Sequence, residues 1–193
     1  ELEALTDVTL LNTEMTINIL PSDQDIPVYS IEQVSGNTET FEADSLNVLC
    51  ELRGIVHGLN TTPAGLQFTL IDPTDGINIY NATNNFEYTV VEGDSIHVTG
   101  IIDQFNGLTQ LVADTVYLIS QDNELNTPQL VGALDESTES QMIQLKCIEL
   151  VDLSEWTNEE PGFTVTVTDG TSEYELRIDA DSDIFGTDAP EGV

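Results

Sequence analysis

The feature that most constrains the fold of this chain is an internal repeat with a period of about 95 residues. The segment "FEADSLNVLCELRGIV" (41–56) is answered by "TESQMIQLKCIELV" (138–151). Four pairs of short segments mark the period: Arg53-Gly54 with Lys146-Cys147, Phe68-Thr69-Leu70 with Phe163-Thr164-Val165, Asp75-Gly76 with Asp169-Gly170, and Glu92-Gly93 with Glu191-Gly192. In a chain of 193 residues this spacing predicts two units of one fold rather than a single large domain.

The repeat is out of phase with the ends of the sequence. The first copy continues after Glu92-Gly93 to "ADTVYLIS" (113–120), whereas "LTDVTLLNTE" (5–14) resembles "VADTVYLISQ" (112–121). We therefore expect a spare closing strand and linker in residues 1–27, a whole domain in 28–121, and a second domain in 122–193 that lacks its last strands. Either the sequence is a piece of a longer covalent array, or the spare strand completes a neighbouring unit. The candidate strand-exchange residues are Val8, Leu10, Ile17 and Ile19.

Nearly all apolar runs in the sequence are strand-like. They are short, rich in Val, Ile, Thr and Tyr, and bounded by Gly, Pro, Asn or Asp, as in "LQFTLID" and "INIYN". Helix is scarce: residues 29–36 predict one turn, and residues 81–89 predict a short helix between the third and fourth strands. This pattern predicts an all-β fold made of tandem five-stranded Greek-key OB barrels, the second incomplete, with an N-terminal spare strand.

The order of several segments adds a resemblance to a known family. "YSIEQVSG", "CELRGIVHG", "GLQFTLIDPTDGINIY" and "VVEGDSIHVTGIIDQFNGLTQL" follow one another here. This order resembles the OB-fold domain found beside endonuclease/exonuclease/phosphatase-type catalytic domains in secreted bacterial nucleases, and similar modules in Bacteroidetes surface proteins. The second copy, with "GFTVTVTDG", is similar to another branch of the same family. The resemblance implies OB barrels of nucleic-acid-binding type, and it includes no catalytic domain.

The charge of the chain argues against a nucleic-acid partner. Three Lys and Arg residues stand against 36 Asp and Glu, which gives a formal net charge of −33. With a salt slope of about −0.9 per neutralised phosphate, three cations support a slope of only roughly −2.7. Arg53 and Lys146 also occupy equivalent positions in separate units, so we do not expect them to converge. Such acidity suits a salty medium or bound divalent cations, and we expect a secreted, extracellular or cell-surface protein of a marine or halotolerant bacterium.

Acidic residues in "DADSDIFGTD" suggest a calcium site. Asp179, Asp181 and Asp183 lie at positions i, i+2 and i+4, the opening spacing of an oxygen-ligand loop, and Asp188 follows. The loop differs from an EF-hand because it lacks the glycine at position six and the glutamate at position twelve. Calcium is therefore a candidate cofactor, and a solvated loop is the alternative.

Two further features have both a binding and a structural interpretation. Trp156 lies in the expected loop between the first two strands of the second copy, a loop that OB domains use for ligands, but it is equally able to pack on its own barrel. Asp72 and Asp75 in "DPTDG" form a weaker cation cluster and are equally good turn residues.

Other motifs restrict the chemistry. Cys50 and Cys147 are expected to be buried small residues, one in each unit, with a bridge between them as the less favoured alternative. His57 and His97 lie in separate predicted strands without a recognisable acid–base partner, and no G-x-S-x-G, HExxH, Walker or Cys-x-x-Cys motif occurs, so no enzyme activity is expected. No stretch reaches the ~20 apolar residues of a membrane helix, and no membrane insertion is expected.

These patterns favour a non-catalytic extracellular module: tandem acidic OB domains of a surface filament or repetitive adhesin. The expected partners are copies of the chain or adjacent OB repeats, in contact through strand exchange. The alternative is an accessory domain that binds a polymer, nucleic acid or surface polysaccharide, for a secreted nuclease or carbohydrate-active enzyme. A calcium-dependent recognition module with its ligand near Trp156 is a third hypothesis.

Overall fold

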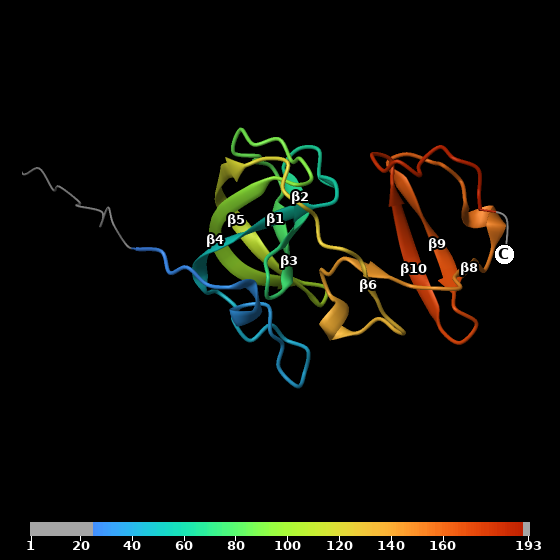
Figure 1. Cartoon of the computed structure of the whole chain (residues 1–193), viewed down its shortest axis with the longest axis horizontal. Coiled ribbons are helices and arrows are strands. Elements are labelled where there is room, and N and C mark those ends of the chain that lie inside the picture. Colours follow the sequence, from blue (N-terminus) through green and yellow to red (C-terminus); the bar gives the residue numbers. More distant parts are fainter. Residues whose placement is uncertain (1–24, 191–193) are drawn as a thin grey trace, which may run out of the picture.

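The first repeat forms a closed five-stranded barrel (Figure 1). The computed structural model describes residues 25–190, which form an all-β chain with three short 3-10 helices. The barrel strands are β1 (Leu49–His57), β2 (Leu66–Ile71), β3 (Gly76–Asn81), β4 (Ser95–Phe105) and β5 (Leu108–Ser120). They close in the order β1-β2-β3-β5-β4, antiparallel except between β3 and β5. This order confirms the predicted OB-type barrel for the first repeat.

The β4–β5 hairpin follows from its sequence. Asn106 and Gly107 have φ values of 52° and 94°, the left-handed conformations that a tight two-residue turn requires. At Gly100 the register shifts, and a Cβ there would lie 2.2 Å from the Val112 carbonyl oxygen, so the close strand crossing accepts only glycine.

The barrel core draws on every strand. Leu52, Leu70, Ile79 and Ile96 are fully buried. Ile31, in η1 (Ile31–Gln33), joins this cluster, so the turn predicted in residues 29–36 is confirmed.

The helix predicted in residues 81–89 is wrong. That stretch is a series of turns, because asparagine side chains take up the backbone N–H groups that a helix would use. Asn81 Oδ1 accepts from the N–H of residues 83 and 84, and Asn85 Oδ1 accepts from Glu87. Phe86 and Glu87 have φ values of 54° and 58°, outside the helical region.

The chain before β1 fills an edge of the barrel. β1 pairs with β4 along Leu49–Ile55, but with β2 only from Ile55 onward. Beside the first half of β1, the Glu51 N–H donates to Pro27 O (2.8 Å) and Tyr29 N–H donates to Glu51 O (3.1 Å). The predicted spare strand, with Val8, Leu10, Ile17 and Ile19, lies outside the described residues.

The second repeat forms an antiparallel sheet in the order β10-β9-β8. Its strands are β8 (Glu149–Leu150), β9 (Gly162–Thr168) and β10 (Glu173–Asp179). Ahead of the sheet lie β6 (Gln129–Leu130), η2 (Glu136–Thr138) and β7 (Ile143–Gln144), and η3 (Leu153–Glu155) lies between β8 and β9. From the repeat anchors, β9 and β10 correspond to β2 and β3. Among the described residues, no helix is long and apolar enough to cross a bilayer.

The stretch "MIQLKCIELV", which the repeat aligns with β1, forms two short strands, β7 and β8, and not one continuous strand. Lys146 and Cys147 lie in a bend between β7 and β8, and Cys147 has a φ of 57°. Cys50 is buried as predicted, but Cys147 is exposed, which corrects the expectation for the second cysteine; both thiols are free. The physical reason is strand pairing. β4 pairs with the first half of β1, whereas none of the strands between residues 25 and 190 pairs with the corresponding segment of the second repeat in this way.

Candidate functional site

An apolar hollow lies on the inner face of the second sheet. Alternation in β9 turns Phe163, Val165 and Val167 inward, where they are buried together with Ile178 of β10. The Trp156 ring packs edge-on against Phe163, with the ring centroids 5.3 Å apart. The Trp156 ring thus covers one part of the inner face, while another part remains accessible.

The open part is a hollow of 350 Å³. Its apolar lining includes Leu150, Val167, Leu176 and Ile184, and Leu176 and Ile184 remain 42% and 43% exposed. In the first repeat, residues of β4 and β5 such as Ile96 and Leu111 belong to the corresponding barrel core and are fully buried. Among the strands of residues 25–190, none covers the core-type side chains of the second sheet as β4 and β5 cover those of the first.

The two edges of the second sheet correspond to strand edges that are paired in the first barrel. β8 and β10 are its edge strands. In the first repeat, β1 pairs with β4 and β3 pairs in parallel with β5. Because β10 corresponds to β3, and β8 to the end of β1, each edge of the second sheet lies where a further strand joins the first barrel. Unpaired edges beside an apolar face are templates for strand addition.

Trp156 is both a packing residue and part of the hollow. It lies between β8 and β9, as the sequence predicted, and its Nε1–H donates to Thr187 O at 2.9 Å. The ring N–H is thus hydrogen-bonded within the second repeat, while the ring itself also lines the hollow. A role in ligand binding remains a prediction.

The predicted calcium ligands do not converge. Asp179 Oδ1 accepts from the Asp181 N–H at 3.1 Å, as part of a turn, and Asp188 lies at the rim of the hollow. Between residues 25 and 190 no three His, Cys, Asp or Glu side chains are grouped to hold a metal ion. Calcium binding by Asp179, Asp181, Asp183 and Asp188 stays a prediction from their spacing.

Asp72 stabilises the turn between β2 and β3 by accepting hydrogen bonds. Its Oδ1 accepts from Thr74 N–H at 2.7 Å and its Oδ2 accepts from Ile31 N–H at 2.9 Å, which ties the β2–β3 turn to η1. Partial burial on its own would raise the pKa of Asp72, but the hydrogen bonds from Thr74 and from the surrounding backbone N–H groups outweigh it. They hold the pKa of this carboxyl below its ordinary value.

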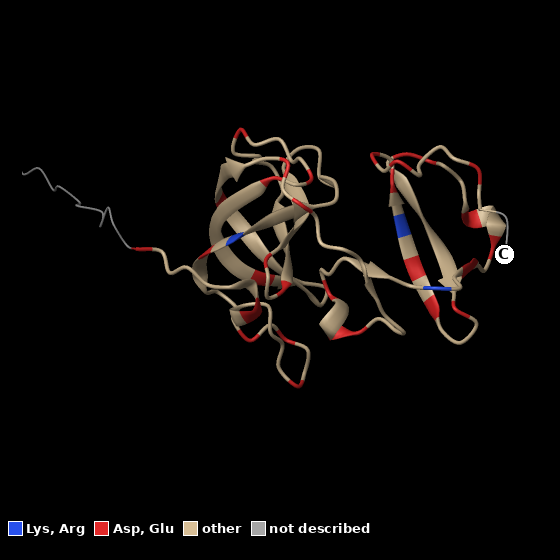
Figure 2. Ribbon diagram, viewed as in Figure 1, with Lys and Arg blue, Asp and Glu red and all other residues tan. Residues whose placement is uncertain are grey.

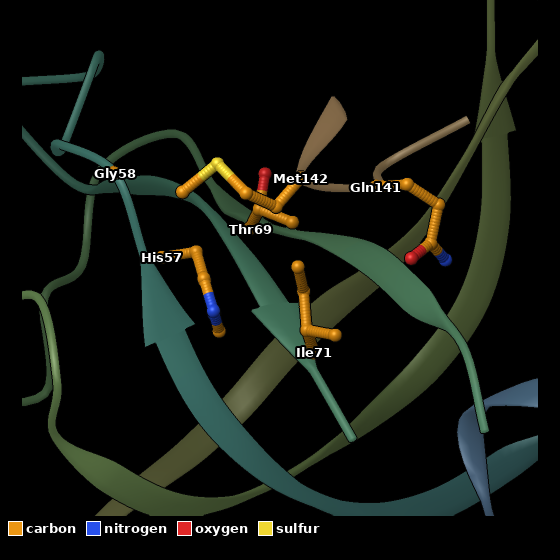
Figure 3. Close-up of a pocket in the computed structure, with 6 residues that line it drawn as sticks. All are labelled: His57, Gly58, Thr69, Ile71, Gln141 and Met142. Carbon is orange, nitrogen blue, oxygen red and sulfur yellow. The ribbon is translucent and has the colours of Figure 1, made fainter. Parts of the chain in front are cut away.

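The outer face of the barrel at β2 and β3 is covered by the chain itself. Residues 135–142, which we call the strap, run across this face. A pocket of 170 Å³ remains beneath them, and Figure 3 shows its lining: Gln141 and Met142 from the strap, and His57, Gly58, Thr69 and Ile71 from the barrel. The strap was not predicted from the sequence, although the cap-like "DEST" marks its start, where Asp135 Oδ1 accepts from Ser137 N–H at 2.9 Å.

Basic side chains are too sparse to form a phosphate-binding groove. Figure 2 shows acidic residues over both repeats and far fewer basic ones. Arg53 lies in β1, Lys146 in the bend between β7 and β8, and Arg177 in β10. Arg53 already pairs with Glu51 at 2.6 Å. No cationic track for a polyanion arises from this distribution.

Comparisons with known proteins leave the family open. No family model and no curated protein matches the chain. Among solved structures, the hypothetical protein ygiW from E. coli gives a TM-score of 0.37 at 14% identity, over 48% of this chain and 89% of that protein. A putative aspartyl-tRNA synthetase from Leishmania major Friedlin gives a TM-score of 0.38 at 8% identity, over 57% of this chain and 23% of that one. Neither similarity carries information about function.

Proposed function

We propose that this chain is a non-catalytic extracellular structural or adhesive module, built from tandem acidic OB domains, that joins its neighbours by strand exchange. In this proposal the second repeat is the acceptor and a neighbouring copy is the donor. Head-to-tail contacts whose rotation does not close into a ring produce filaments. The chain would serve as one segment of a surface filament or repetitive adhesin.

The observation that carries the proposal is the hollow of the second sheet. It combines exposed Leu176 and Ile184 with two sheet edges that correspond to paired edges in the first barrel. Covering these side chains would stabilise the complex by about 25 cal/mol for each Å² of apolar surface buried. Strand pairing would also satisfy the N–H and C=O groups of the sheet edges. An added strand would thus be bound by both its side chains and its backbone.

The sequence of the chain contains a matching donor. Residues 5–14 resemble the end of β5, and Val8, Leu10, Ile17 and Ile19 alternate with polar residues in two short stretches. One such stretch for each free edge would supply apolar side chains on one face, as β4 and β5 do in the first barrel. The high negative charge opposes association at low ionic strength, so we expect assembly to be favoured by salt.

The rival proposal, an accessory polymer-binding domain of a secreted enzyme, has less support. OB barrels bind oligonucleotides and oligosaccharides on the face of strands 2 and 3. Here the strap covers that face of the first barrel, and few cations are present. Titration with single-stranded DNA at low salt tests the nucleic-acid form of this rival, and we expect no binding.

Light scattering of the purified chain tests the strand-exchange proposal. We expect the mean mass to rise with protein concentration and with NaCl, and we expect a version lacking residues 1–24 to stay monomeric because the donor is gone. Equal, concentration-independent monomer masses for both proteins would overturn the proposal.

A matched pair of variants locates the acceptor. Leu176→Asp places a charge in the hollow and should abolish association. Leu153→Asp changes the same residue type at an exposed position (62% exposed) that does not line the hollow, and it should leave association unchanged. Equal effects of the two substitutions would show that the hollow is not the contact.

A further inference from the structure

The strap approaches the barrel more closely than a loose linker would. A Cβ built on Gly76 would lie 2.0 Å from the Ser140 carbonyl oxygen, so β3 accepts only a glycine beneath this part of the strap. Gly76 is buried, and its φ is not in the left-handed region, so the requirement comes from the approach of the strap and not from the backbone of β3.

Polar contacts fix the strap at several points. Glu139 Oε1 accepts from the Thr109 N–H at 3.1 Å, and Glu136 Oε2 accepts from Asn37 Nδ2 at 2.6 Å. Gln141 Nε2 donates to Asp75 Oδ1 in the β2–β3 turn. These partners come from three separate parts of the barrel, so the strap is held across its length.

The barrel face beneath the strap has the side chains of a covered surface. Asn78 and Gln110 face outward from β3 and β5, yet they are only 7% and 6% exposed. Asn78 Nδ2 donates to Gln110 Oε1 at 3.3 Å. Outward polar residues on an open sheet face are solvated, whereas buried ones need hydrogen-bond partners. Besides the bond between the two, Gln110 Nε2 donates to Asp103 Oδ2 at 3.5 Å.

The connector upstream of the strap is also docked. Asn123 N–H donates to Gly93 O at 2.9 Å, and Asn126 N–H donates to His57 Nε2 at 3.0 Å. His57 is itself buried, with its Nδ1 within 3.0 Å of Ile55 O. The chain is therefore hydrogen-bonded to the first barrel at residues 123 and 126 and again at residues 136–141, while between these points β6 pairs with β7.

We propose that the strap is a built-in occupant of the outer β2–β3 face, which keeps this face shut to polymers and fixes the second repeat to the first. The occupant is residues 135–142 of the same chain. Its close approach to Gly76 and its hydrogen bond to Asp75 hold the strap against the barrel. In an array, the same joint would transmit force between repeats without a flexible hinge. The inference does not depend on whether the second sheet accepts a strand.

Hydrogen exchange and ¹⁵N relaxation of the full chain test this inference with two Gln→Glu variants, one in the strap and one as a control. Gln141→Glu replaces the donor to Asp75 by a second carboxylate, so the strap should open and the Thr109 amide should exchange about tenfold faster. Gln144→Glu makes the same change at an exposed side chain and should have no effect on Thr109. In the unmodified protein the two repeats should tumble with one correlation time, and in Gln141→Glu with two.

A second pair tests the close approach itself. Gly76→Ala should displace Ser140 and open the strap, whereas Gly132→Ala, with no atom within 4 Å of the new Cβ, should not. Unchanged exchange of the β1 and β4 amides verifies that the barrel remains folded in each variant. The inference is overturned if the unmodified strap exchanges at the rate of an unstructured peptide, or if the repeats of the unmodified protein tumble independently.

Discussion

The first and second repeats share three corresponding strands and differ in what lies beside them. In the first, β4 and β5 close the sheet and bury Leu52, Leu70 and Ile79 completely. In the second, the described sheet stops at three strands, and Leu176 and Ile184 stay partly exposed.

Similar sequences form similar strands only where a neighbouring strand pairs with them. β1 runs without interruption from Leu49 to His57 because β4 pairs with its first half. The corresponding stretch in the second repeat bends at Lys146 and Cys147, where none of the strands described supports it. Local propensity is alike in the two copies, and the tertiary context decides the outcome.

The largest contrast that we expect between the repeats is in thiol reactivity. Burial raises the pKa of Cys50 to about 11, whereas Cys147 is exposed. Alkylation with iodoacetamide at mildly alkaline pH should therefore modify Cys147 rapidly and Cys50 only when the barrel opens, because the thiolate is the reactive form. Mass spectrometry should detect a single early adduct. Two early adducts would mean that the barrel core is accessible, and none would mean that Cys147 is covered.

Core truncations should affect the repeats unequally. Leu52→Ala in the barrel should cost about 2–5 kcal/mol and leave the barrel folded. Ile178→Ala should cost a similar amount, but the second core consists of Phe163, Val165, Val167 and Ile178, so the sheet should unfold outright. Hydrogen exchange of each repeat measures the outcome. A second sheet that stays protected in Ile178→Ala would contradict the view that it is weakly held.

The turn carboxylates offer a smaller contrast. Asp72→Asn removes an acceptor from the partly buried N–H of Ile31 and should destabilise the barrel by about 1–3 kcal/mol, as measured by urea unfolding. Asp169→Asn, in the exposed turn between β9 and β10, should have a smaller effect. Because the pKa of Asp72 is lowered from an ordinary 3.8, its stabilisation is complete above that value and lost as the pH falls through the lowered pKa. Equal losses in the two variants would remove the distinction between the turns.

The smallest effect concerns Glu139 in the strap. Burial raises its pKa, the hydrogen bond from Thr109 N–H counteracts this, and the charges of Glu136 and Asp75 raise it again. The resulting stabilisation of the closed strap is therefore present in acid and lost as the pH rises through the raised pKa. Glu139→Gln keeps an acceptor and removes the charge, so strap amides should exchange about twofold more slowly at neutral pH. Faster exchange in this variant would show that the charge helps to hold the strap.

Much of the first barrel could be predicted from the sequence because its signals are local. Alternation in β2 and β4 and the Asn106-Gly107 turn specify strands and their reversal without reference to distant residues. The break at Cys147 could not be predicted in this way, since it depends on tertiary pairing, which the described strands do not provide at this position. The asparagine-rich turns after Asn81 compete with a helix through side-chain hydrogen bonds, which the apolar spacing does not reveal.

The candidate site was predicted only in part. The position of Trp156 between two strands followed from the repeat, but its hydrogen bond to Thr187 depends on how the following chain folds back. The strap was missed because its contacts join residues far apart in sequence, such as Glu139 with Thr109 and Gln141 with Asp75. Within the barrel, Gly76 bears a local trace of the strap, but a glycine after "DPTD" is explained equally well by a turn.

The central claim, that the second sheet accepts a strand from a neighbouring copy, is tested most directly by hydrogen exchange of β8 and β10 over a range of protein concentrations. We predict that their amides become more protected as concentration rises, in step with the measured mass, while the first barrel is unchanged. Exchange in β8 and β10 that stays the same from dilute to concentrated solution would contradict the account.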